Sequence, residues 1–231
     1  MDNTPKTESI KNIMTNIKSS DMVLPEFQRD FVWDLGKTYD LFDSLVKDIF
    51  IGSIIYGIPS FEITVRELDN RPRKGVGSQK KLKLESYSIE QIDNKVKIGN
   101  FKIILDGQQR ITSVYRALSG TDEVWFTCKT NGDLSDTDYS SITLENLLHQ
   151  VSGQESSNHL SIRLSDAYEI MEKSYLESDI REKYFNKLSY IVGRSSEEKY
   201  IIFRKYLRVV SKIQDLLKAE KLFSYYLLNT T

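Results

Sequence analysis

Five polar or flexible residues, Asp106-Gly107-Gln108-Gln109-Arg110, interrupt the stretch FKIILDGQQRITSVYRAL at positions 101–118. The Asp106 carboxylate could cap a helix, hold a divalent ion or activate a nucleophile. The amides of Gln108 and Gln109 can orient a water or hydrogen-bond a base or ribose, and the Arg110 guanidinium presents a planar fork to an anion. Together these residue types could bind a phosphorylated ligand and catalyse a reaction of that ligand.

The apolar residues around this segment predict a strand that passes directly into a helix. The strand is indicated by Val96, Ile98, Ile103, Ile104 and Leu105, and the helix by Ile111, Val114, Tyr115 and Leu118. A helix that begins at Gly107 leaves its first backbone N–H groups without intrahelical partners and concentrates positive partial charge there. The junction therefore predicts a phosphate site. The structural alternative makes Asp106 an N-cap, Gly107 a tight turn and Arg110 a surface cation.

Composition excludes several classes of protein. The chain has 231 residues with 32 Lys plus Arg against 33 Asp plus Glu, so any contact with nucleic acid must come from a local basic patch. One cysteine and two histidines do not suffice for an internal disulfide, a Cys-rich zinc site or a His-based metal cage. Because we find neither an apolar run that could cross a bilayer nor a secretion signal, we expect a cytoplasmic protein without a membrane partner.

The N-terminal half mixes predicted helices and strands. Thr4-Pro5 starts one helix that ends near Ser20, and Asp34 caps a second helix that Gly52 closes. SIIYGIP, FEITVREL and EVWFTCK are predicted strands, with Cys128 as an inert buried thiol in the last. KLKLESYSIEQID and NKVKIGNFKIIL are predicted to pair as antiparallel strands joined near Asp93-Asn94.

From about Ser141 the pattern becomes helical. SITLENLLHQV and two longer segments carry helical periodicity, and the last of these opens with a capping box at Ser195 and Glu198. We therefore expect an α+β chain with a first domain over residues 1–130 and a mostly α-helical region over residues 131–231. LFSYYLLNTT predicts a terminal strand, which suggests that the chain is truncated at this point.

Two further segments carry candidate binding residues. PEFQR offers Phe27, Gln28 and Arg29, although Phe27 could instead pack in the core and Arg29 could pair with a neighbouring acid. The segment DNRPRKGVGSQKKLK could follow a DNA backbone, or could be a solvated hairpin insert. Its candidate DNA-binding residues are Arg71, Arg73, Lys74, Lys80 and Lys81.

Three segments, in chain order, resemble the N-terminal domain of GmrSD-type and SspE-type restriction proteins. They are LPEFQRDFVWD (24–34), FIGSIIYG (50–57) and ILDGQQRITSVYRALSG (104–120). That domain is similar to the ParB/sulfiredoxin-like superfamily, so the resemblance implies a mixed sheet with helices in the N-terminal half. It also implies that the domain binds and hydrolyses a nucleoside triphosphate and senses modified DNA in phage defence.

The resemblance assigns roles to individual residues. Gly107, Gln108 and Arg110 would hold nucleotide phosphates, with Gln28, Arg29 and Ser53 lining the same pocket. Asp106, Gln109 and Arg110 would be the catalytic residues, and Asp106 would position Mg²⁺ or water. The nucleotide could be ATP, GTP, CTP or UTP. Phe27 would join the basic segment in contacting DNA.

The resemblance also implies partners: DNA, including modified phage DNA, and a downstream HNH-type nuclease domain or a partner subunit. It leaves a homodimer open. The chain departs from the family pattern because no Asn-Gly-Gly segment follows the terminal strand and two histidines cannot build an HNH cluster. We therefore expect no DNA cleavage from this chain alone. Two alternatives to an NTPase stay open: a non-hydrolysing DNA- or nucleotide-binding regulatory module, and an interaction subunit with a vestigial motif.

Overall fold

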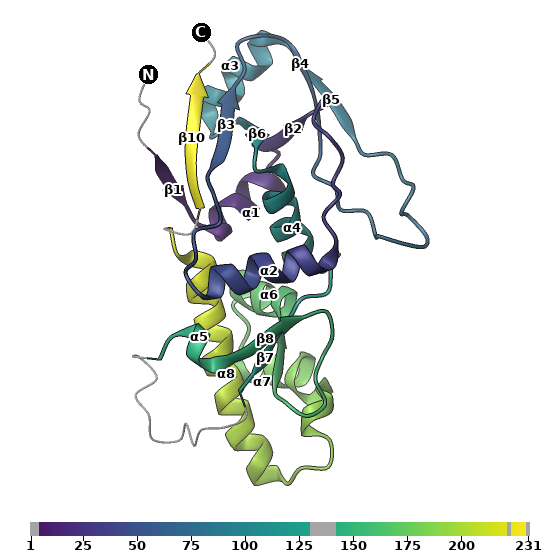
Figure 1. Cartoon of the computed structure of the whole chain (residues 1–231), viewed down its shortest axis with the longest axis vertical. Coiled ribbons are helices and arrows are strands. Elements are labelled where there is room, and N and C mark those ends of the chain that lie inside the picture. Colours follow the sequence, from purple (N-terminus) through teal and green to yellow (C-terminus); the bar gives the residue numbers. More distant parts are fainter. Residues whose placement is uncertain (1–4, 130–141, 221–222, 230–231) are drawn as a thin grey trace. The chain divides into compact units, whose positions relative to one another are not determined.

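The computed structural model describes residues 5–129, 142–220 and 223–229 (Figure 1). Its contacts divide the chain into two compact units. The first unit takes in the chain up to Asp34, Phe50–Thr121 and the chain from Lys218 onward, and the second takes in Leu35–Ile49 and Asp122–Leu217. The assignment of residues 1–130 to a nucleotide-binding domain stays a prediction.

The first unit is built on a mixed sheet of seven strands in the order β1-β10-β3-β6-β2-β4-β5. The strands are β1 (Lys6–Glu8), β2 (Met22–Pro25), β3 (Ile54–Ile58), β4 (Ile63–Arg66), β5 (Leu84–Tyr87), β6 (Lys102–Asp106) and β10 (Phe223–Asn229). β2 runs parallel to β6, whereas β3 runs antiparallel to it. The carboxyl end of β6 therefore lies between the end of β2 and the start of β3. A mixed sheet with helices fits the expected α+β class.

The terminal strand predicted from LFSYYLLNTT is present as β10. It runs parallel to β3, with Tyr225 opposite Ile54, and antiparallel to β1, with Tyr225 opposite Lys6 (Figure 1). Because both of its edges are paired, β10 is an interior strand of the sheet rather than an unpaired one. This strand brings the last described residues of the chain back to the first unit.

A buried ion pair joins three of these strands. Lys102 of β6 donates from Nζ to Glu8 of β1 at 2.9 and 3.0 Å, and the Tyr56 hydroxyl of β3 donates to Glu8 at 3.1 Å. Burial lowers the pKa of the Lys102 ammonium, although the Glu8 carboxylate opposes that effect. Burial and Glu8 together raise the pKa of Tyr56. Paired in this way, the buried charges are tolerated in the sheet.

The described residues of the first unit form the helices α1 (Ile10–Lys18), α3 (Ile89–Ile98) and α4 (Gln108–Leu118). α1 starts later than Thr4-Pro5 predicted, because residues 6–8 form β1 and Ser9 is the N-cap. The predicted strand over Val96 and Ile98 is wrong. Ser88 and Gln91 form a capping box that starts a helix there, and Ile92 packs into the core with Phe101.

The second unit holds a three-stranded sheet in the order β8-β7-β9 together with helices. Its elements are α2 (Leu35–Val46), β7 (Trp125–Cys128), α5 (Leu144–Leu147), β8 (Leu148–Ser152), β9 (Ser161–Arg163), α6 (Leu164–Lys173), α7 (Glu177–Lys183) and α8 (Ser196–Lys218), with 3-10 turns at Phe185–Lys187 and Ser189–Ile191. The helix predicted for SITLENLLHQV is only one turn long, because β8 takes over at Leu148. The capping box at Ser195 and Glu198 is confirmed by reciprocal bonds of 2.8 and 3.2 Å.

Two smaller expectations have clear outcomes. Cys128 is buried in β7, and burial raises the pKa of its thiol to about 12, as expected for an inert cysteine. Gly52 is not the C-cap of α2, because that helix ends at Val46. Within the described ranges, we find no helix long and apolar enough to span a membrane.

Candidate functional site

The predicted junction between strand and helix is present at the carboxyl end of β6. Asp106 ends the strand, Gly107 has a left-handed φ of 86°, and α4 begins at Gln108 without a side-chain cap from Gly107. A Cβ on Gly107 would lie 2.9 Å from Ile54 Cγ1, so the backbone conformation and the crowding both require glycine. The first N–H groups of α4 have no intrahelical acceptor, which makes this helix start suited to an anion.

Asp106 is the exposed carboxylate of the junction. Its side chain is 68% exposed, and Oδ2 lies 3.8 Å from Arg110 Nη2, one helical turn later. At that distance and exposure the pair contributes little to stability. Asp106 is therefore available to a ligand, a metal ion or a water.

Gln108 and Gln109 are buried and bind the backbone of the segment after β2. Gln109 Oε1 accepts hydrogen bonds from the amides of Val32 and Trp33 at 2.9 and 3.2 Å, and its Nε2 donates to the Asp30 carbonyl at 3.0 Å. Gln108 Nε2 donates to the Arg29 carbonyl. These amides thus fix residues 29–33 beside the start of α4. Gln108 Oε1 is buried without a partner, so it retains the capacity to accept one hydrogen bond.

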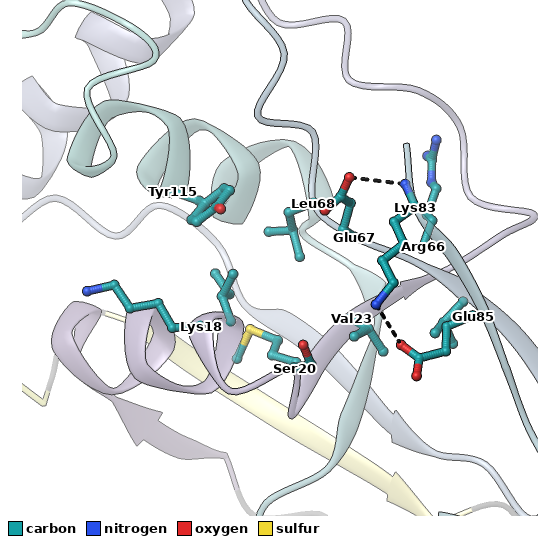
Figure 2. Close-up of a pocket in the computed structure, with 12 residues that line it drawn as sticks. Lys18, Ser20, Val23, Arg66, Glu67, Leu68, Lys83, Glu85 and Tyr115 are labelled. Atoms are coloured by element: carbon teal, nitrogen blue, oxygen red, sulfur yellow. Dashed lines mark hydrogen bonds and ion pairs between the residues drawn. The ribbon is translucent and has the colours of Figure 1, made fainter. Parts of the chain in front are cut away.

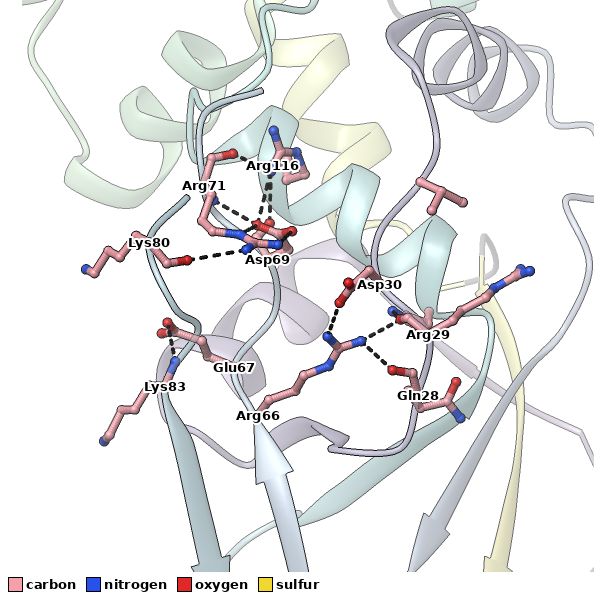
Figure 3. Close-up of polar contacts among 12 residues, drawn as sticks. Gln28, Arg29, Asp30, Arg66, Glu67, Asp69, Arg71, Lys80, Lys83 and Arg116 are labelled. Atoms are coloured by element: carbon pink, nitrogen blue, oxygen red, sulfur yellow. Dashed lines mark hydrogen bonds and ion pairs between the residues drawn. The ribbon is translucent and has the colours of Figure 1, made fainter. Parts of the chain in front are cut away.

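Gln28 and Arg29 lie in the same segment but play different parts. Gln28 Nε2 donates to the Leu105 carbonyl at 2.9 Å, which joins the segment to the end of β6. Arg29 is exposed, and its side chain points away from Arg66 (Figure 3). Phe27 is 74% exposed, so the alternative that it packs in the core is wrong.

Arg110 binds the segment before β3. Its Nη1 donates to the Ile51 carbonyl at 2.7 Å and its Nη2 to the Ser53 carbonyl at 2.9 Å, with 15% of the side chain exposed. These bonds use two of the five N–H groups of the guanidinium. Ser53 therefore meets Arg110 through its backbone carbonyl.

Gly52 is needed for this contact. It has φ of 89°, and a Cβ there would lie 2.6 Å from Arg110 Nη1. The sequence marks this position as a glycine in FIGSIIYG, where it suggests a helix end and gives no sign of a contact with Arg110. We name the set formed by Gly52, Gln108, Gln109 and Arg110 the junction clamp, because these residues hold the two segments that border Asp106.

Arg66 is a site residue that sequence reasoning missed. This buried residue of β4 donates from Nη1 to Asp30 at 2.6 Å and from Nη2 to the carbonyls of Gln28 and Arg29 (Figure 3). Arg66 and Gln108 therefore both donate to the Arg29 carbonyl and hold this segment together. An arginine in an otherwise ordinary strand pattern gave no sign of this role.

The basic segment between β4 and β5 is anchored to the first unit at several points. Asp69 accepts two bonds from the Arg71 guanidinium, at 3.0 and 2.7 Å, and these hold the pKa of Asp69 below its usual range although burial raises it. Arg73 donates to the Trp33 carbonyl at 2.6 Å. The side chains of Lys74, Lys80 and Lys81 are exposed.

A cavity of about 390 Å³ lies elsewhere in the first unit (Figure 2). Val23, Leu68 and Tyr115 give it apolar walls, and Lys18, Glu67, Lys83 and Glu85 place charges around it. None of the residues from Asp106 to Arg110 lines it. Arg66, which also binds the backbone of Gln28 and Arg29, does line it.

The side chains of the junction limit the kind of metal ion that could bind there. The described ranges contain no group of three or more His, Cys, Asp or Glu side chains that could hold a metal ion. Mg²⁺ is commonly bound by one or two carboxylates together with substrate phosphates and waters. The single exposed carboxylate of Asp106 fits that pattern, and it does not fit a metal held by protein ligands alone.

Two comparisons place the chain among known proteins. Residues 10–231 match the model of the family described as "GmrSD restriction endonuclease, N-terminal domain". The chain is also 25% identical over 114 residues to an uncharacterized protein of Methanocaldococcus jannaschii. That match covers 48% of this chain and 17% of the relative, so the chain spans less than a fifth of the relative's length.

Proposed function

This chain belongs to the family of GmrSD restriction endonuclease N-terminal domains, and from that premise we propose that it is the nucleotide-binding, NTP-hydrolysing sensor domain of a modification-dependent restriction protein that acts in phage defence. The proposal includes the ParB/sulfiredoxin-like fold for residues 1–130. It also includes a nuclease, supplied by a downstream domain or a partner subunit, and a homodimer as one assembly.

The observation that supports nucleotide binding is the junction itself. A helix start without a side-chain cap leaves its first N–H groups without intrahelical partners, and the exposed Asp106 lies beside it. Phosphate oxygens suit the amides, and a carboxylate suits the metal ion or water that accompanies a triphosphate.

The proposed mechanism assigns these parts in order. The amides from Gln108 onward bind phosphate oxygens, aided by the N–H groups of Arg110 that the Ile51 and Ser53 carbonyls do not use. Asp106 would hold Mg²⁺, which neutralises charge on phosphate oxygens during hydrolysis, or would orient the attacking water. Gln109 and Gln28 act in this scheme by fixing the segment that borders the water. Arg29, exposed on that segment, is a second cation for the phosphates.

The test measures binding and phosphate release in the intact protein. ATP, GTP, CTP and UTP are each supplied with Mg²⁺, with and without DNA. We expect Asp106→Asn to lower turnover by about 100-fold or more, the scale typical of a lost acid–base or charge-stabilising group. Asp93→Asn is the matched control, because Asp93 is an exposed carboxylate of α3 in the same unit. Equal turnover in the two variants, or no turnover with any nucleotide, contradicts hydrolysis at this site.

A second function, nucleotide or DNA binding without hydrolysis, is favoured by one observation. All three hydrogen bonds of the Gln109 amide go to the protein's own backbone, so this side chain orients a segment rather than a water. Calorimetric binding of a nucleotide that is lost in Asp106→Asn, in a protein that releases no phosphate, would select this function. In both functions the basic segment with Arg71, Arg73, Lys74, Lys80 and Lys81, together with Phe27, is proposed to contact DNA.

A further inference from the structure

A second cavity, of about 220 Å³, lies where the basic segment meets α4. Three guanidinium groups line it, those of Arg71, Arg73 and Arg116, together with one carboxylate, that of Asp69. Phe31, Pro72 and Ser78 complete the lining. Sequence reasoning placed Arg71 and Arg73 on a DNA-contacting loop, but it assigned no role to Arg116 or Phe31. We call this cavity the arginine pocket.

The guanidinium groups of the arginine pocket are held in fixed orientations. Arg116, only 2% exposed, donates to the carbonyls of Asp69 and Arg71 at 3.2 and 2.7 Å. The Arg71 guanidinium is bound by the Asp69 carboxylate and also donates to the Lys80 carbonyl at 3.3 Å (Figure 3). Side chains that are already ordered lose little conformational entropy when a ligand binds.

Phe31 provides the aromatic part of the lining. The Arg116 and Arg73 guanidinium carbons lie 5.1 and 5.4 Å from the centre of its ring. Cations at this distance are attracted to the ring face, so one uncharged residue positions two of the three guanidinium groups. The 29–33 segment that carries Phe31 is in turn held by the junction clamp.

Size and charge together restrict the ligand. Drug-sized and cofactor ligands occupy cavities of roughly 300–1,000 Å³, so this pocket is too small for a whole nucleoside triphosphate. Planar guanidinium forks match the oxygens of phosphate, and a lining with three cations and one anion favours an anionic group. Lys74, Lys80 and Lys81 are exposed on the same segment, so they add cations for neighbouring phosphates of a DNA backbone.

We propose that the arginine pocket binds one phosphate group of a DNA backbone, with exposed Arg73 as the direct contact and with Phe31 and buried Arg116 as positioning residues. This inference rests on the DNA-contacting part of the proposed function, and it fixes the place at which DNA is held. It is independent of hydrolysis at Asp106.

The test is the salt dependence of DNA binding, measured by fluorescence anisotropy with the intact protein and a labelled DNA duplex. Each phosphate contact makes the negative slope of log K against log salt steeper by about 0.9. We expect Arg73→Gln to make this slope less steep by about 1 and to lower the affinity by about tenfold. Phe31→Leu should weaken binding several-fold without changing the slope, because it removes no charge.

The control is Lys97→Gln, which removes one exposed cation of α3 that lines neither cavity. It should leave the slope unchanged. A parallel calorimetric titration with inorganic phosphate distinguishes a DNA phosphate from the phosphate of a small molecule as the ligand. If Arg73→Gln loses inorganic phosphate but not DNA, the pocket takes a small phosphorylated molecule instead.

The inference is overturned if Arg73→Gln and Lys97→Gln give the same DNA slope and the same phosphate affinity. Turnover of the nucleoside triphosphates is measured on the same samples. If turnover is normal but Arg73→Gln and Lys97→Gln give equal slopes, only the proposal for the arginine pocket is rejected. If the two slopes differ but no nucleotide is turned over, only the proposal of hydrolysis at Asp106 is rejected.

Discussion

Replacement of Gly52 by alanine should weaken the junction clamp where Arg110 contacts the segment before β3. The new Cβ would lie 2.6 Å from Arg110 Nη1, closer than carbon and nitrogen can approach without a bond. The guanidinium, the flexible end of its side chain, must therefore shift, and this weakens its contacts of 2.7 and 2.9 Å with the carbonyls of Ile51 and Ser53. A non-glycine residue in the left-handed region also costs about 1–2 kcal/mol.

The expected loss of stability follows from the weakened hydrogen bonds and the backbone strain. A hydrogen bond to a charged group contributes about 1.5–3 kcal/mol, and the bonds at Ile51 and Ser53 are of this kind. We expect Gly52→Ala to lower the free energy of unfolding by about 2.5–5 kcal/mol, the equivalent of one such bond plus the backbone strain, which is a large part of the 5–15 kcal/mol typical of a domain. Once Arg110 is alanine, the same glycine change should cost only the backbone strain of about 1–2 kcal/mol.

The assay is a double-mutant cycle in urea, with Gly52→Ala, Arg110→Ala and the double variant. We expect an interaction energy of about 1.5–3 kcal/mol between the two positions. Gly75→Ala is the matched control: Gly75 also has a left-handed φ, of 81°, but nothing lies within 4 Å of the Cβ position. It should be additive with Arg110→Ala. Additivity of the Gly52 and Arg110 changes within about 0.5 kcal/mol would refute the clamp.

The other predictions concern both units. Gln109→Ala removes three hydrogen bonds to the 30–33 backbone, so it should lower the free energy of unfolding by about 2–4 kcal/mol. It should also red-shift the fluorescence of Trp33, whose amide donates one of these bonds. Unchanged emission and unchanged stability would contradict the junction clamp. Burial, with Glu169 and Glu123 nearby, raises the pKa of Asp166 to about 6 from 3.8. The folded state then binds the extra proton between these values, so stability falls as pH rises from about 4 to 6, and Asp166→Asn should abolish that fall in urea titrations. Because the Cys128 thiol is buried with its pKa raised to about 12, disulfide reagents at pH 8 should react only at the rate of unfolding, and rapid reaction would contradict that burial.

Local patterns predicted the start of α4 correctly. Ile111, Val114 and Leu118 are buried at the spacing that the sequence indicated, and Gly107 takes the left-handed conformation at the junction. These features depend on neighbours within one or two turns, so a single stretch of sequence carries the information. The terminal strand was recognisable for the same reason.

Competition between structural preferences explains why one predicted strand and most of one predicted helix did not form. In NKVKIGNFKIIL the alternation of Val96 and Ile98 favoured a strand, but the Ser88–Gln91 capping box and burial of Ile92 favoured the helix that forms. In SITLENLLHQV the helical spacing held for one turn before pairing with β7 imposed β8. Tertiary pairing outweighed a weak local preference in the second segment.

By itself the sequence determined that a polar, glycine-containing junction follows a buried strand, and that its residue types suit a phosphorylated ligand. Only the tertiary structure decided what each side chain does: Gln109 binds amides 76 and 77 residues earlier, and Arg110 binds carbonyls 57 and 59 residues earlier. Hydrogen bonds between such distant residues depend on how the strands are ordered in the sheet, and short-range periodicity contains no record of that order. For the same reason Arg66, Arg116 and Phe31 became candidates for function only once their neighbours in space were known.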